Sequence, residues 1–203
     1  MRAVLATLTL LTVVGTASAQ GFSPLDTTTP IPYFVHDGVA GSEYRPADRQ
    51  LAVWALQTWE RVVGGRLKFQ PSSEADALIQ VHWVPAAEGQ YGEARPLRVG
   101  NRRGAAVYIR PDTSALGPDI ARQTRSDPLL RETIVYLTCV HELGHALGLA
   151  HNTDPRSLMC CVHVSLDFND PAVREAYVEA RRHPDVASVR AQLAAHYERF
   201  WRK

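Results

Sequence analysis

Strong net charge is absent from this sequence, and so is any long hydrophobic run beyond its first nineteen residues. The 203 residues contain 22 Lys and Arg against 21 Asp and Glu, which gives a formal charge of +1. A chain this close to neutrality has no strong electrostatic attraction for nucleic acid or for an anionic membrane surface. We therefore expect no nucleic-acid partner and no membrane span in the mature chain.

The N-terminus has the composition of a targeting segment. Arg2 provides a positive start, residues 3–17 are uncharged and largely apolar, and a small-residue cleavage signal ends at Ala19. The apolar run is too short and too weakly hydrophobic for a good membrane span. The sequence predicts a signal peptide over residues 1–19, cut after Ala19, and a secreted or periplasmic mature chain over residues 20–203. An uncleaved anchor is the alternative.

Cysteines are few: Cys139, Cys160 and Cys161. An odd number in an exported chain leaves at least one thiol unpaired or pairing between chains. A bridge from Cys139 to either of the others stays open, because spacing cannot establish it. Cys139 lies two residues before His141, about 200° around a helix. We expect it to be a small buried hydrophobe rather than a metal ligand.

The most informative segment is HELGHALGLAH, residues 141–151, which fits the pattern H-E-x-x-H-x-x-G-x-x-H. His141 and His145 are four residues apart, so a helix places them on one face, one turn apart. Glu142 is rotated about 100° from His141. From there it would reach a water molecule beside a metal ion rather than the ion itself.

The end of this segment predicts a third ligand. Gly148 can adopt a left-handed turn at little cost, which lets the chain double back and bring His151 to the same ion. Three protein ligands leave the fourth tetrahedral position for water, which is typical of catalytic rather than structural zinc. The sequence therefore predicts one catalytic zinc ion on His141, His145 and His151, with Glu142 as the catalytic residue.

Two simpler interpretations of this segment are alternatives to a catalytic zinc site. The segment could be an ordinary helix whose histidines cap or fill space, or a zinc site that has lost catalysis; the intact Glu142 argues against the second.

The remaining histidines are expected at the surface or in the core, and His163 is the one that could border a cleft. These residues are His36, His82, His163, His183 and His196.

Hydrophobic periodicity predicts an α/β or α+β sheet domain with a helical C-terminal part. Residues 77–84 alternate as a strand, and Trp54 and Trp59 share a helical stripe that is expected in the core. Further strands are predicted at residues 31–36, 66–70 and 104–110, and helices at 46–63, 171–182, 185–201 and from Asp127-Pro128 through the histidine motif. A flexible start is predicted at 20–30, a long loop at 85–103 with at most a short edge strand, and another loop at 111–126.

The extended histidine motif resembles that of the metzincin metallopeptidases, and the segment after it resembles the matrixins. In residues 151–159 (HNTDPRSLM) the third histidine is followed by a short Asp-Pro loop and a methionine, as in matrixins. The resemblance covers roughly residues 30–165 and is strongest over residues 133–160.

This resemblance implies an α+β fold, with a twisted, mostly parallel sheet over an active-site helix. One antiparallel edge strand would line a horizontal substrate cleft. A single catalytic domain is implied over residues 20–203, divided into an upper subdomain (20–149) and a lower helical subdomain (150–203). The resemblance carries zinc ligation onto the three motif histidines and catalysis onto Glu142. It carries the Met-turn, the methionine beneath the imidazoles, onto Met159.

Several features depart from relatives of this kind. Cys161 stands where some metzincins have a tyrosine, so no tyrosine switch is expected. Residues 85–103 contain no His or Asp, so neither a second, structural zinc nor calcium is supported. About ten residues, none of them cysteine, separate the predicted cut from the first strand, so latency through a blocking cysteine is not expected. The helices of residues 170–203 exceed what a matrixin domain needs.

Motif and resemblance together predict an exported zinc-dependent endopeptidase that acts on proteins or peptides. A zinc-activated water would attack the peptide carbonyl, while Glu142 accepts its proton and passes it to the leaving amine. The alternative is a catalytically silent zinc-containing binding or scaffold protein, with the C-terminal helices as its docking surface. A third reading is a narrow processing enzyme for one envelope or secreted partner.

Overall fold

A computed structural model of the chain describes residues 22–87, 91–154, 157–160 and 167–202, so the expected signal peptide lies outside the described residues. Its sheet has the strand order β2-β1-β3-β5-β4. Neighbouring strands run parallel except at one edge, where β4 is antiparallel to β5. This confirms the expected α+β fold with a mostly parallel sheet. The strands are β1 (Ile31–Val35), β2 (Phe69–Pro71), β3 (Ile79–Trp83), β4 (Gly92–Val99) and β5 (Arg102–Ile109).

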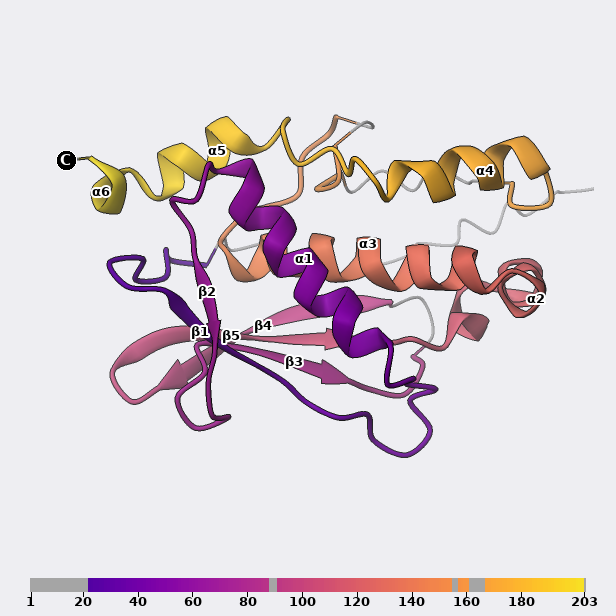
Figure 1. The fold of residues 1–203 in the computed structure, drawn as a ribbon, viewed down its shortest axis with the longest axis horizontal. Coiled ribbons are helices and arrows are strands. Elements are labelled where there is room, and N and C mark those ends of the chain that lie inside the picture. Colours follow the sequence, from indigo (N-terminus) through magenta and orange to yellow (C-terminus); the bar gives the residue numbers. More distant parts are fainter. Residues whose placement is uncertain (1–21, 88–90, 155–156, 161–166, 203) are drawn as a thin grey trace, which may run out of the picture.

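Helices cover one side of this sheet, and α3 lies between the sheet and the C-terminal helices (Figure 1). Within the described ranges, none of the helices combines the length and the apolar character that crossing a bilayer requires. The helices are α1 (Asp48–Val62), α2 (Pro118–Ser126), α3 (Pro128–Ala146), α4 (Pro171–Ala180), α5 (Arg190–His196) and α6 (Glu198–Trp201), with a 3-10 helix η1 at Thr113–Leu116.

The core lies between the sheet and helices α1 and α3. The alternation of β3 turns Ile79, Val81 and Trp83 inward, each at most 1% exposed. On α1, Trp59 is fully buried and donates from its indole nitrogen to the carbonyl of Val140, 3.0 Å away. This hydrogen bond ties α1 to the middle of α3, directly before the histidine motif.

The prediction that Trp54 shares the core with Trp59 was wrong, because Trp54 is 50% exposed. Five helical residues separate the two positions by about 140°, so they cannot lie on one narrow stripe. By contrast, α3 begins as predicted. Pro128 is its first residue, and the Asp127 carboxylate caps the helix by accepting from the Leu130 amide at 3.1 Å.

Two segments expected to be mostly loop contain more regular structure than predicted. The short edge strand allowed within residues 85–103 is in fact eight residues long, at 92–99, and its charged residues and Pro96 suit an edge, where one side needs no ladder partner. Helix α2 replaces part of the loop expected at 111–126, and only Ala121 and Thr124 of its residues are buried, which is too little for a visible apolar stripe.

The two ends of the described chain also differ from expectation. The single helix expected at 185–201 is two short helices, α5 and α6, joined at Tyr197. The start expected to be flexible contains Leu25, which is fully buried and whose amide lies 3.4 Å from the Tyr197 hydroxyl. The two ends therefore pack on each other, a long-range contact that local periodicity does not encode.

Candidate metal centre

Helix α3 carries two of the predicted ligands to one point at its C-terminal end. The Nε2 atoms of His141 and His145 are 3.1 Å apart, and the Nε2 atom of His151 lies 3.2 Å from the first and 3.1 Å from the second. Zinc–nitrogen bonds of about 2.0–2.1 Å at tetrahedral angles place ligand nitrogens about 3.3 Å apart. The three imidazoles therefore fit a single zinc ion, and a metal could be held there.

Backbone carbonyls set the orientation of the two helical imidazoles. His141 donates from Nδ1 to the Leu158 carbonyl at 2.6 Å, and His145 donates from Nδ1 to the Leu149 carbonyl at 2.8 Å. A proton held on Nδ1 leaves the lone pair on Nε2, which is the atom that faces the other histidines. Both rings are thus prepared as neutral nitrogen donors.

The turn after α3 delivers the third histidine. Gly148 has a φ of +101°, a backbone conformation that favours glycine. The Gly148 amide donates to the carbonyl of His145 at 2.8 Å, and the Leu149 amide donates to that of Gly144 at 3.0 Å. This closes the helix and reverses the chain toward His151, as expected for the glycine in the motif.

Burial favours the uncharged form of the two imidazoles on α3. It is the largest cause of the fall in the pKa of His141 to about 4, and the neighbouring His145 adds to it. Burial also lowers the pKa of His145. Neutral imidazoles are the form that binds zinc, so the site is available to a cation at neutral pH.

Glu142 lies beside the three histidines but belongs to a different contact. Its side chain is 6% exposed and rests against Gly92, the first residue of edge strand β4. A Cβ atom at position 92 would come within 2.5 Å of both Cγ and Oε1 of Glu142. Burial raises the pKa of Glu142 to about 8; the nearby Glu93 carboxylate raises it further, and Arg110 opposes this. The carboxyl group is thus held against the start of β4, and its pKa is raised.

Met159 is fully buried behind the ligand helix. A Cβ atom at Gly144 would lie 2.5 Å from the Met159 sulfur, so the methionine packs against the backbone between His141 and His145. Its carbonyl accepts from the Asn152 amide at 2.8 Å, which ties it to the segment after His151. The methionine that the sequence singled out thus supports the cluster from below.

The remaining histidines lie apart from this cluster, except for His163, which lies outside the described residues. His36 and His82 stack across β1 and β3 with ring centroids 3.9 Å apart. His183 is exposed, and His196 packs over Gly148. Cys139 is a buried free thiol whose pKa is raised by burial, in agreement with its predicted role as a small hydrophobe.

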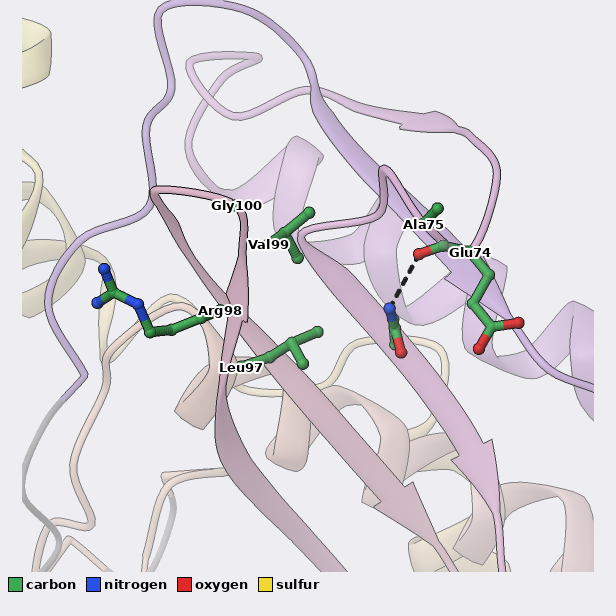
Figure 2. Close-up of a pocket in the computed structure, with 7 residues that line it drawn as sticks. Glu74, Ala75, Leu97, Arg98, Val99 and Gly100 are labelled. Atoms are coloured by element: carbon green, nitrogen blue, oxygen red, sulfur yellow. Dashed lines mark hydrogen bonds between the residues drawn. The ribbon is translucent and has the colours of Figure 1, made fainter.

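A surface pocket of about 430 Å³ lies elsewhere, where the hairpin of β4 and β5 meets the segment before β3 (Figure 2). Gln80 donates there to the Glu74 carbonyl at 2.9 Å. None of the histidines or Glu142 contributes to this pocket, so the metal centre is not in it. Its lining residues are Glu74, Ala75, Gln80, Leu97, Arg98, Val99 and Gly100.

Sequence reasoning missed the residues that support the site. The carbonyls of Leu149 and Leu158 orient two imidazoles, and a backbone acceptor leaves no mark on residue type. Gly92 did carry a signal, because a glycine inside a strand often marks a close approach by another group. The strand that contains Gly92 had no predicted bounds, so this signal could not be assigned to a contact with Glu142.

Comparison with known proteins agrees with this geometry. The family model described as matrixin matches residues 42–174, more than half of the chain. The macrophage metalloelastase of Oryctolagus cuniculus is 32% identical over 117 residues, which cover 57% of this chain and 24% of the relative. The human matrix metalloproteinase-20 is 31% identical over 129 residues, which cover 58% of this chain and 24% of the relative. The chain thus matches about a quarter of the length of each relative. The extent of the family match, together with the sheet and the histidine cluster, establishes that this chain belongs to the matrixin family.

Proposed function

We propose that this chain is an exported zinc-dependent endopeptidase that uses Glu142 as its general base. Matrixins are zinc metalloendopeptidases, and the observation that carries the proposal for this member is the convergence of three Nε2 atoms at 3.1–3.2 Å beside a buried carboxyl group. Neutral imidazoles and an adjacent acid of raised pKa are the groups that metal-assisted hydrolysis requires.

The roles of the residues follow from their positions. His141, His145 and His151 would hold a zinc ion, which would supply Lewis-acid activation of a water molecule and of the substrate carbonyl. Glu142 accepts the proton of the attacking water and transfers it to the leaving amine. Burial raises the pKa of Glu142 in the metal-free chain, and the positive charge of a bound zinc ion would oppose this rise and favour the carboxylate form that accepts a proton. His141 and His145 keep their Nδ1 protons on backbone carbonyls and stay in the ligand tautomer.

Edge strand β4 supports a protein substrate. One side of β4 pairs with β5, and its other side forms the edge of the sheet. It begins at Gly92, against Glu142. An extended peptide that added to this edge would have its backbone held close to the catalytic carboxyl group. We therefore propose unfolded segments or loops of proteins as the substrate class.

Export is the second part of the proposal, and it depends on residues 1–19. Their pattern is that of a cleavable signal peptide with its cut after Ala19. Expression in a bacterial host with fractionation, followed by N-terminal sequencing, tests this directly. Recovery outside the cytoplasm with Gln20 as first residue supports export, and an intact N-terminus in the cytoplasm contradicts it.

The catalytic part is tested with a peptide library and mass-spectrometric readout, comparing the zinc-loaded wild type with Glu142→Gln. We expect cleavage by the wild type and a rate lower by about 10²–10⁴-fold in the variant, because the general base is lost while the ligands remain. Equal cleavage by both proteins would exclude Glu142 as the base. Zinc binding without cleavage of the library or of unfolded proteins would favour the silent binding protein.

A further inference from the structure

The segment of residues 185–197, which contains helix α5, packs against the back of the metal centre. Its apolar residues Val186, Val189, Leu193 and Tyr197 are at most 4% exposed. They share one core with the leucines on either side of Gly148. The turn that leads to His151 is therefore covered by the C-terminal part of the chain. We refer to residues 185–197 as the positioning segment.

The first contact of this segment is made by His196. A Cβ atom at Gly148 would overlap the Nε2 atom of His196 and lie 2.8 Å from the Cδ2 and Cε1 atoms of its ring. The imidazole thus occupies the place that a side chain at position 148 would take. The ring packs against the turn at Gly148. The next residue, Leu149, provides the carbonyl that orients His145.

The second contact reaches the carbonyl that orients His141. The Ser188 hydroxyl donates to the Ser157 hydroxyl at 3.2 Å, and the Leu158 amide donates to the Asp185 carbonyl at 3.4 Å. The Ser157 oxygen also accepts from the Met159 amide at 3.2 Å. Residues 157–159 are thus fixed from the side that faces the positioning segment, and the Leu158 carbonyl is fixed with them.

We propose that the positioning segment sets the geometry of the zinc ligands: His196 holds the turn that orients His145, and Ser188 holds the turn that orients His141. This inference rests on the proposed zinc site. Groups that orient a ligand histidine through its second nitrogen control metal affinity strongly, which gives these remote contacts a measurable effect. It also gives a role to a C-terminal region that is longer than the histidine motif requires.

A role in packing alone does not account for His196. The apolar residues of the segment are themselves buried, Leu193 and Tyr197 completely. Among the described residues, the buried Nε2 atom of His196 has no hydrogen-bond partner, which costs stability compared with an apolar side chain of similar size. A histidine at this position is therefore better explained by its fit over Gly148 than by stability.

The test measures the zinc dissociation constant of the folded full chain by competition with a chromophoric chelator, without any substrate. We expect His196→Ala to weaken zinc binding by about tenfold and Ser188→Ala by a smaller factor. The matched control is His183→Ala, which removes an exposed histidine from the preceding turn and should leave the constant within about twofold. His196→Gln keeps atoms near the position of Nε2 and should restore most of the affinity.

Thermal melting of the metal-free proteins separates positioning from packing. If His196→Ala lowers the melting temperature while the zinc dissociation constant matches that of His183→Ala, the segment only packs and the proposal is overturned. Ser188 is exposed, so Ser188→Ala preserves the fold and provides the same comparison if His196→Ala does not fold. A wild type that binds zinc tightly but cleaves nothing would contradict the endopeptidase and leave this proposal standing. A wild type that binds no zinc would overturn both.

Discussion

Helix α3 joins two regions that are stabilised in different ways. In its first half, Leu130 and Ile134 pack with Phe168, and Arg131 forms two buried hydrogen bonds of 2.7 and 2.9 Å with the Asp48 carboxylate. In its last turns, the half-buried His141 and the buried Glu142 have pKa values shifted toward their neutral forms, to about 4 and about 8. The buried charge of Arg131 in the first half has a partner, whereas the second half holds ionisable groups whose charged forms are disfavoured by burial.

The difference shows how one helix can serve both fold and chemistry. The buried Arg131–Asp48 pair links α3 to the start of α1, and its geometry satisfies both carboxylate oxygens. Burial lowers the pKa of Arg131, but the hydrogen bonds and charge of Asp48 outweigh this and raise it. The first half therefore anchors the helix. In the second half, the burial of ionisable groups lowers the stability of the metal-free chain, and metal binding would offset this loss.

The largest effect is expected from breaking the anchor. Asp48→Ala leaves the buried Arg131 without its counter-charge and should lower the free energy of unfolding by about 3–5 kcal/mol. The exposed pair of Asp119 and Arg122 is the control, and Asp119→Ala should cost less than about 1 kcal/mol. Urea unfolding of both variants measures this. Similar losses in the two would mean that the first half is not held by its buried ion pair.

Metal removal should act on the other half. At zinc concentrations about a hundredfold above the dissociation constant, binding stabilises the folded chain by about 2.7 kcal/mol, which a chelator removes. Amide hydrogen exchange should then accelerate more at residues 146–152 and 157–160 than at residues 128–138. Only the first two segments carry or orient the ligand histidines, whose positions a bound ion would hold. Equal acceleration along the whole of α3 would erase the distinction between its halves.

A smaller effect, on the catalytic rate alone, is expected from a substitution in edge strand β4. Gly92→Ala displaces the Glu142 side chain and should lower kcat by about tenfold, close to 1.4 kcal/mol, without changing zinc affinity. Arg98→Ala on the same strand is the control, because its exposed side chain lines the surface pocket to which none of the site residues contributes. A loss of zinc in Gly92→Ala, or an unchanged kcat, would show that Glu142 is not positioned by this contact.

The smallest effect concerns pH and lies outside the site. Burial, followed by the charge of His36, lowers the pKa of His82 to about 4 from its usual 6.5. Between these values the unfolded chain takes up a proton that the folded chain refuses, so stability is full above pH 6.5 and is lost toward pH 4. For this half-exposed ring we expect the free energy of unfolding to fall by about 1 kcal/mol.

His82→Phe preserves the stack between His36 and Tyr108 and removes this titration. Unfolding measured at pH 7 and pH 4.5 should therefore show a smaller drop in the variant than in the wild type, since the other histidines titrate in both. An equal drop would assign the acid sensitivity to other groups, including the metal ligands.

The sequence could predict what local chemistry encodes. Strict spacing placed three histidines and a glutamate on a helix and its following turn, and Asp127-Pro128 marked the helix start. The family resemblance implied the edge strand, but the local pattern indicated a loop with at most a short strand, because exposed, charged residues and Pro96 conceal the alternation that marks a buried strand. Contacts between distant segments, such as His196 over Gly148, depend on how the finished layers meet, and no local pattern reports them.

The central claim is that three histidines at the end of α3 hold one zinc ion for hydrolysis. Equilibrium titration of the metal-free full chain with zinc, beside His145→Ala, tests it most directly. We predict one tightly bound zinc ion per wild-type chain, and loss of this site together with the metal-dependent stability in the variant. A wild type that binds no zinc, or a variant that binds it equally well and melts at the same temperature, would contradict the account.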